Sequence, residues 1–133
     1  MSQHTYTVEI RVFGVEPELI TKNLGLSPCQ TWRKGTERIR GKTDPDMWAY
    51  NGAIEKERAW ESLEEGLTFV VDKLWDHREA LAEYMQTGAR IIWWCGHFYS
   101  SFDGGPSLSA GLLGKLGAFG AELFIDNYYH PPD

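Results

Sequence analysis

A thiol and an imidazole lie two residues apart in the segment Cys95-Gly-His97, the first place where this 133-residue chain could do chemistry. Cysteine and histidine bind metals, and Cys29 could supply a third ligand. Metal sites, however, usually use paired ligands such as C-x-x-C, and no such pair occurs here. Side chains at i and i+2 of a strand stand parallel, ~6–7 Å apart, which is too far for a nucleophile and its base. We therefore predict no metal, no cofactor and no catalytic residue here.

An acid–base site around His97 is the alternative. General acid–base catalysis needs only a carboxylate within hydrogen-bond reach of the imidazole, and Glu9 or Asp126 could supply one from a neighbouring strand. Nothing in the sequence places these residues side by side. The alternative function is thus a small enzyme or small-molecule binder with a pocket around His97.

A basic segment, residues 32–42, contrasts with the rest of the chain. It has five basic residues and one acid, whereas the whole chain has a net charge of −6. Glycines and the Thr43-Asp-Pro-Asp46 turn predict a flexible loop over about 32–46. Its side chains could bind a phosphate or carboxylate, or lie against the chain's own acidic helix. The candidate residues in this basic segment are Trp32, Arg33, Lys34, Arg38 and Arg40.

An acidic helical surface is predicted between about Glu55 and Gln86, where apolar residues recur at helical spacing. Like charges at i and i+4 cost a few tenths of a kcal/mol each, so the arrangement needs a reason. One reason is a basic partner protein, with Trp75 as an aromatic anchor. The carboxylates on this side are Glu57, Glu61, Glu64, Glu65, Asp72, Asp76, Glu79 and Glu83. The candidate partner-binding residues are Glu61, Glu65, Asp72 and Trp75.

Alternating and helical periods along the chain predict an α+β fold. Strands are expected at 5–13, 47–50, 90–99 and 121–129. Helices are expected at 16–25, at 55–86 with a bend near Asp76, and at 107–117. The closest standard arrangement is an elaborated ferredoxin-like sandwich, with a mostly antiparallel sheet and helices packed on one face. We predict a single domain over 1–133 with a short tail at 130–133.

The strand at 90–99 carries large apolar side chains on both alternating faces, so we expect it at the centre of the sheet. Helices on one face leave the other face open, and Trp93 or Trp94 must point to that side. Contiguous exposed apolar patches usually mark interaction sites. The candidate binding residues of the open face are Glu9, Arg11, Trp93, His97, Tyr99 and Asp126.

The composition excludes several classes of function. A net charge of −6 argues against nucleic acid and anionic membranes as partners. No apolar run approaches the roughly 20 residues of a membrane span, and the first residues do not resemble a signal peptide. Two cysteines form no disulfide framework, so we predict a soluble, cytoplasmic protein with reduced thiols.

Several short segments, taken together, resemble the domain-of-unknown-function 4279 family, a bacterial group of about this length. They are Pro17-Glu-Leu-Ile20, Leu24-Gly-Leu-Ser-Pro28, Lys34-Gly35, Trp48-Ala-Tyr50, Leu63-Glu-Glu-Gly-Leu67 and the closing Leu-Gly-Ala-Phe-Gly-Ala-Glu-Leu-Phe-Ile-Asp126. The resemblance covers nearly the whole chain and supports the fold. It implies no activity and no catalytic residues.

The sequence therefore predicts a non-enzymatic interaction module that binds an unknown protein, with a basic protein as one candidate, and that can form a homodimer. A small acidic bacterial protein that neutralises a basic toxin would have such a surface. An immunity-like role is thus an analogy for this chain.

Overall fold

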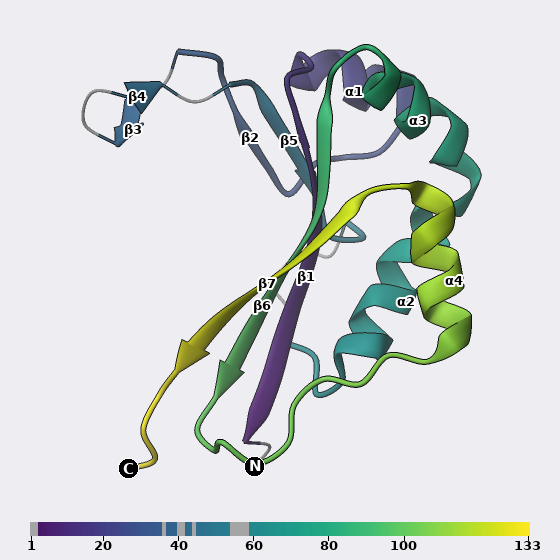
Figure 1. Ribbon diagram of the computed structural model, residues 1–133. Helices are drawn as coiled ribbons and strands as arrows, with labels where there is room; N and C mark the ends of the chain where they lie inside the picture. Colours follow the sequence, from purple (N-terminus) through teal and green to yellow (C-terminus); the bar gives the residue numbers. More distant parts are fainter. Residues whose placement is uncertain (1–2, 36, 40–41, 44, 54–58) are drawn as a thin grey trace.

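The computed structural model describes residues 3–35, 37–39, 42–43, 45–53 and 59–133, with the backbone alone for 37–39 and 42–43. Its main sheet has five strands in the order β2-β5-β1-β6-β7 (Figure 1). The strands are β1 (His4–Phe13), β2 (Gln30–Trp32), β5 (Met47–Tyr50), β6 (Arg90–Tyr99) and β7 (Glu122–Tyr129). Neighbouring strands are antiparallel except β6 and β7, which are parallel.

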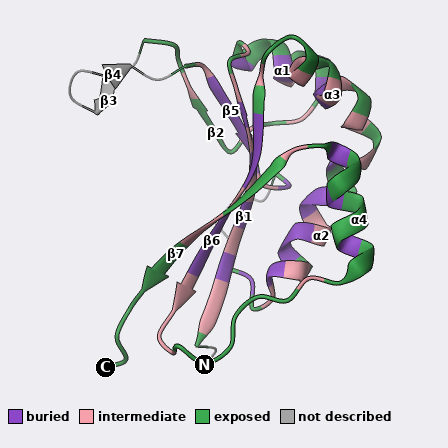
Figure 2. Cartoon of the chain, viewed as in Figure 1, coloured by how far each residue is buried: buried purple, intermediate pink, exposed green. Residues whose placement is uncertain are grey.

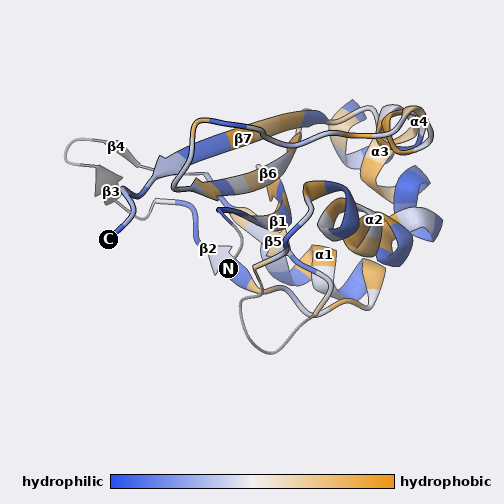
Figure 3. Cartoon of the chain, turned by 90° about the horizontal axis from the view of Figure 1, so that it is seen from below, coloured by the Kyte–Doolittle hydropathy of each residue, from blue (hydrophilic) through white to orange (hydrophobic). Residues whose placement is uncertain are grey.

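Four α-helices and one 3₁₀ turn lie on a single face of this sheet (Figures 1 and 3). They are α1 (Pro17–Leu24), α2 (Leu63–Leu74), η1 (Trp75–His77), α3 (Arg78–Gln86) and α4 (Ala110–Phe119). The prediction of an α+β fold with a mostly antiparallel sheet and helices on one face is confirmed. The finer comparison with a ferredoxin-like sandwich rests on element order and stays a prediction.

Helix ends follow the local sequence. Pro17 lies in the first turn of α1, and Gly25 ends that helix in the left-handed conformation. The Ser62 and Ser109 side chains accept hydrogen bonds from backbone N–H groups in the first turns of α2 and α4. Gly120, with φ 70°, ends α4, three residues beyond the predicted end at Gly117.

One hydrophobic core fills the space between the sheet and the helices. Ile10 and Trp93 are fully buried on neighbouring strands. Leu67 of α2, Leu81 of α3 and Leu116 of α4 belong to the same cluster. The alternating burial of β1, with its even-numbered residues buried from Tyr6 to Val12, is the pattern of a strand that packs on one face (Figure 2).

Strand β6 lies inside the sheet, between β1 and β7, and β1 has the middle position. One sequence-based prediction about a helix is wrong. Trp60 is not helical: its backbone exchanges hydrogen bonds with Tyr6 at 2.7 and 2.6 Å, and α2 starts only at Leu63. The predicted bend near Asp76 is confirmed, since η1 separates α2 from α3. Residues 54–58 lie outside the described part of the chain.

The basic segment contains two very short strands, β3 (Glu37–Ile39) and β4 (Lys42–Thr43), which pair as a separate sheet. Figures 1 and 3 place this hairpin on the side of the main sheet away from α2 and α3. The described backbone of the segment is therefore not docked on the acidic helices. The predicted flexibility of 32–46 stays a prediction.

Candidate functional site

The pairing register decides which side chains share the open face of the sheet. Glu9 lies opposite Trp94 and Arg11 opposite Ile92, whereas Ile10 lies opposite Trp93. Directly paired residues point to the same side. The open face therefore carries Trp94, and Trp93 points into the helix-covered core.

The six residues predicted for the open face thus divide between the two faces. Glu9, Arg11 and Asp126 lie on the open face; Trp93, His97 and Tyr99 lie on the opposite one. The prediction that all six residues share one face was wrong. Both faces of β6 carry apolar residues, so the sequence does not indicate which face packs against the helices. The open face instead carries the alternate residues of β6 and β7, of which the large apolar and aromatic ones are Ile92, Trp94, Phe98, Phe124 and Tyr128.

Arg11 lies at the middle of the open face. Its Nε donates a hydrogen bond of 2.8 Å to Glu9 Oε2, and only 15% of its side chain is exposed. The guanidinium lies 4.2 Å from the centre of the Trp94 ring and 5.6 Å from that of Trp32. A cation between aromatic rings gains up to ~2 kcal/mol when it is desolvated. Arg11 is therefore held in one position by a carboxylate and two indoles.

Aromatic side chains continue from Arg11 toward the edge of the sheet. The rings of Trp94 and Phe124 are 4.6 Å apart, and those of Phe98 and Tyr128 stack at 4.9 Å. The Tyr128 hydroxyl donates a hydrogen bond to Asp126, and this bond raises the pKa of Tyr128. Phe124 is 43% exposed and Tyr128 42% exposed. The described part of the open face is thus an aromatic surface with the carboxylates Glu9, Glu122 and Asp126 and the arginines Arg11 and Arg90.

Apolar residues are buried beneath this surface although the helices lie on the other side. Met47 and Ile92 are almost fully buried, yet neither belongs to the core cluster. Trp32 is opposite Met47 in the register, and Arg11 is opposite Ile92. The Trp32 ring also meets Phe13 edge to face, with 6.3 Å between the centroids. Part of the open face is therefore packed by its own large side chains.

His97 lies at the other end of the covered face, where it is buried with 7% exposure. Its Nε2 shares a 2.9 Å hydrogen bond with Nδ1 of His4, and its Nδ1 bonds Oδ1 of Asn127 at 2.8 Å. The rings of Tyr6 and Tyr99 stack on it, each at 4.8 Å. Both ring nitrogens are occupied within the protein. The arrangement is that of a satisfied buried imidazole more than that of a base waiting for a substrate.

Cys95 is buried next to this network. Burial, with a smaller contribution from the charge of Glu9, raises the pKa of its thiol to about 12. A thiol with so high a pKa stays protonated near neutral pH and is a poor nucleophile and metal ligand. Cys29 is exposed, on the segment before β2. Cys95 is buried and Cys29 is exposed, so the two thiols do not share a site. Both ring nitrogens of His97 are already hydrogen-bonded, to His4 and to Asn127.

The acidic residues of α2 and α3 do not form one straight row. Glu61 precedes α2, and η1 turns the chain before Glu79 and Glu83. Glu64 accepts a hydrogen bond from the backbone N–H of Ser109. The predicted partner-binding carboxylates Glu61, Glu65 and Asp72 are exposed, while Glu57 lies outside the described residues.

Trp75 is a structural residue of this helical layer. Its ring meets Phe119 edge to face at 5.9 Å, and the Arg78 guanidinium lies 3.6 Å above it. Arg78 Nε also donates to the Trp75 carbonyl at 2.8 Å. Lys115 Nζ approaches Asp72 at 4.0 Å. The chain's own cations therefore occupy part of the surface that a basic partner would need.

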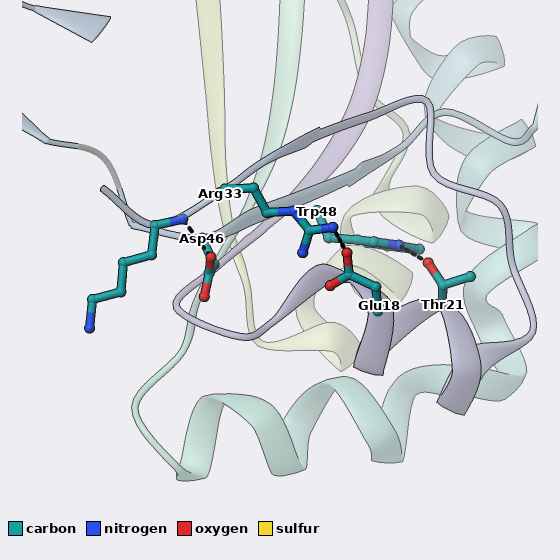
Figure 4. Close-up of polar contacts among 6 residues, drawn as sticks. Glu18, Thr21, Arg33, Asp46 and Trp48 are labelled. Carbon is teal, nitrogen blue, oxygen red and sulfur yellow. Dashed lines mark hydrogen bonds and ion pairs between the residues drawn. The ribbon is translucent and has the colours of Figure 1, made fainter. Parts of the chain in front are cut away.

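The first basic residues of the segment have partners within the protein, and Arg33 lies against α1 (Figure 4). Arg33 forms an ion pair with Glu18, and the Lys34 backbone N–H donates to Asp46 at 2.6 Å. Beside them Trp48 Nε1 donates to Thr21 Oγ1 at 3.0 Å. A mostly apolar hollow of about 300 Å³ is lined by Pro17, Glu18, Thr21, Lys22, Pro28 and Thr31.

The other predicted residues of this segment are separated from Arg33. Trp32 lies on the open face beside Arg11. Arg38 belongs to β3, for which only the backbone is described, and Arg40 lies outside the described residues. The structure therefore does not gather the described basic residues into one anion site.

Comparison with known proteins identifies the family of this chain. A family model described as a domain of unknown function, DUF4279, matches residues 4–130. The chain belongs to the DUF4279 family. No curated protein and no solved structure matches it.

In the described part of this DUF4279 chain, none of the helices has the length and apolar character needed to cross a membrane. Within the same residues, no group of three or more His, Cys, Asp or Glu side chains is arranged to hold a metal ion. The aromatic open face is the feature that residue types and register bring together most clearly.

Proposed function

We propose that this DUF4279 protein is a non-enzymatic interaction module that binds a partner protein through the open face of its sheet. The observation that carries the proposal is the row of large aromatic side chains around Arg11 on the face opposite the described helices. Tryptophan, tyrosine and arginine dominate the binding energy of protein interfaces. These aromatic side chains lie on the side of the sheet away from the core, so their exposed area is available to a partner.

The held position of Arg11 favours binding. A side chain that is already fixed loses little conformational entropy when a partner covers it, and this loss costs about 0.5–1.5 kcal/mol for a long side chain. Glu9 and two indoles fix the guanidinium at 2.8, 4.2 and 5.6 Å. A partner that covers Arg11 also excludes water from the Arg11–Glu9 pair and strengthens it.

The acidic helical surface has a supporting role in this proposal. A chain of net charge −6 with exposed carboxylates on α2 and α3 attracts a basic partner over a distance and speeds association. Trp75 is already packed under Arg78, so the aromatic contacts come from the sheet. The partner is a basic protein, and nucleic acid is not the target.

The wider setting belongs to the same proposal. The protein acts in the bacterial cytoplasm, in an immunity-like or regulatory role toward its partner, and forms a homodimer. The support is the composition and the resemblance to a bacterial family, since the fold by itself carries no function.

A small enzyme around His97 is the weaker candidate. Both ring nitrogens of His97 are hydrogen-bonded inside the protein, and Glu9 and Asp126 lie on the opposite face of the sheet. A general acid or base must reach the substrate proton through one of these nitrogens.

The test is partner capture from an extract of the source cells with matched variants. Trp94→Ala and Phe98→Ala change the open face on β6, and Leu113→Ala removes an exposed apolar side chain from α4. We expect the two open-face variants to lose a protein that the wild type and Leu113→Ala retain, while all three stay folded by circular dichroism. Equal capture by all variants, or loss only with Glu61→Lys/Glu65→Lys, would overturn the proposal. A His97→Ala variant that stays folded and keeps capture excludes the weaker candidate as the cause.

A further inference from the structure

Strand β7 forms a long border of the sheet. The strand order ends at β7, and Figure 3 shows this strand on the outer side of β6. Most of its eight residues are exposed (Figure 2). The exposed large apolar or aromatic residues of β7 are Leu123, Phe124, Tyr128 and Tyr129. A border strand with apolar side chains on both faces attracts another strand.

The direction of the backbone groups in β7 follows from one hydrogen bond. The His130 N–H, directly after β7, donates to the Tyr99 carbonyl of β6 at 2.9 Å. N–H and C=O groups of successive residues in a strand point alternately to its two sides. The even-numbered residues of β7 therefore point toward β6, and Leu123, Ile125, Asn127 and Tyr129 direct their N–H and C=O groups outward.

The sequence of β7 lacks the usual devices that protect an edge. Native edge strands are commonly very short or carry lysine or proline. The opposite edge, β2, has only three residues. The eight residues of β7 contain neither lysine nor proline, and their charges are limited to Glu122 and Asp126. No lysine or proline in β7 therefore prevents its outer edge from pairing with another strand along its length.

We propose that β7 pairs antiparallel with β7 of a second copy of this chain, across a two-fold axis at Ile125. A two-fold axis perpendicular to the sheet can pass a residue whose backbone groups point outward, which exchanges hydrogen bonds with its copy, or a residue whose groups point toward β6, which faces its copy without such bonds. Axes at Ile125 and at Asp126 overlap the two strands equally, over residues 122–128 and 123–129. An axis at Asp126 sets two carboxylates against each other, whereas an axis at Ile125 sets two apolar side chains together.

The occupant is a second copy because the border is self-complementary. Each copy supplies the outward groups of Leu123, Ile125 and Asn127, and the antiparallel register sets Leu123 against Asn127 of the other copy. Two copies satisfy each other's edges without a further partner. The pairing joins two five-stranded sheets into one and brings the two open faces side by side. This pairing rests on the proposed homodimer and gives it a specific interface. Partner capture through Trp94 does not depend on the pairing.

Sedimentation of the full chain over a concentration series tests the pairing. We expect a dimer for the wild type and a monomer for Ile125→Pro, whose missing N–H is one that points away from β6. Glu122→Gln, which changes an exposed side chain of the same strand and leaves the backbone intact, should remain a dimer. A monomeric wild type, or a dimer that survives in folded Ile125→Pro, would overturn the inference.

Disulfide trapping decides the register even if Ile125→Pro does not fold. In a Cys29→Ser background, Ile125→Cys should form an intermolecular disulfide, because hydrogen-bonded antiparallel partners have Cα atoms about 5.5 Å apart. Asn127→Cys should not, since its copy is displaced by four residues along the strand. Cross-linking of Asn127→Cys but not Ile125→Cys, or a dimer lost with Trp94→Ala, contradicts pairing at Ile125. Capture of a partner protein by the monomeric variant would show that the proposed function stands without the dimer.

Discussion

The two faces of the sheet use the same residue types for different purposes. Trp93 and Trp94 are neighbours in β6, yet Trp93 is fully buried against Phe119 of α4, and Trp94 is half-buried beside Arg11. The pleat alone sends them to opposite sides. On the covered face the aromatic area stabilises the fold, whereas on the open face much of it stays accessible. Residue type therefore says little about role until the register is known.

The largest expected effect separates these two tryptophans. Trp93→Ala should lower the free energy of unfolding by about 3–5 kcal/mol, because it leaves a cavity in the core. Trp94→Ala should cost only about 1–2 kcal/mol, since less apolar area is lost from a half-buried side chain. Urea unfolding followed by circular dichroism measures both. Similar losses for the two variants would erase the distinction between the faces.

A second contrast is chemical and concerns Cys95 of the covered face. Its pKa is raised to about 12 in the folded protein from 9.0. The pKa of the Cys95 thiol is higher in the folded chain than in the unfolded chain. The protonated thiol therefore contributes its full stabilisation to the folded state below pH 9, and this contribution is lost as pH rises toward 12. The expected slope is at most about 1.4 kcal/mol per pH unit.

Cys95→Ala should flatten the stability profile between pH 9 and 10, before the tyrosines ionise. Burial also raises the pKa of Tyr6 and Tyr50, so part of the loss at higher pH belongs to them. Cys29→Ser is the matched control and should leave the slope unchanged. Equal labelling of both thiols in the native protein at neutral pH would show that Cys95 is not buried.

Alanine substitutions at two glycines compare the tightly packed core with the open surface of a helix. A Cβ at Gly66 of α2 would meet Trp60 at 2.8 Å and Val8 at 2.9 Å in the core. Gly66→Ala should therefore cost about 1–3 kcal/mol. A Cβ at Gly114 of α4 meets nothing within 4 Å, so Gly114→Ala should stabilise by up to about 1 kcal/mol through helix propensity. Thermal unfolding of both variants measures this, and a destabilised Gly114→Ala would contradict the packing of α4.

Arg11→Met should have only a moderate effect on stability. It keeps the apolar stem but removes the ion pair with Glu9 and the contacts of the cation with Trp94 and Trp32, at a cost of about 1–2 kcal/mol. Partner capture should nevertheless fall strongly, because the guanidinium lies in the middle of the proposed binding surface. Lys115→Met, which removes the ion pair of Asp72 on the helical side, is the control. Loss of stability without loss of capture would make Arg11 structural.

Much of the fold could be predicted from periodicity, and the site could be predicted less well. The strand at 90–99 was predicted with the bounds it has, because glycine and a turn flank a strongly apolar run. The helical assignment of Trp60 was wrong, because an aromatic residue at this spacing suits a helix and a bridge to β1 equally well. Local patterns do not reveal such a long-range pairing.

The open-face residues show the same limit. Three of the predicted residues, Arg11, Glu9 and Asp126, do lie on the open face. The sequence had no signal for the side on which the helices pack, so Trp93, His97 and Tyr99 were grouped with them. The contact of Arg11 with Trp32 depends on two long-range pairings, of β2 with β5 and of β5 with β1. No spacing in the sequence encodes these pairings.

The central claim is that the open face binds a partner protein, and the indole N–H signals of the six tryptophans test it most directly. Chain labelled with ¹⁵N-tryptophan is mixed with the captured partner, and each signal is assigned by substitution. We expect Trp94 and Trp32 to shift or broaden, while Trp93 and Trp48, which lie fully buried on the covered face, keep their positions. A perturbation confined to Trp75, on the acidic helical side, or one that leaves Trp94 unchanged, would contradict the account.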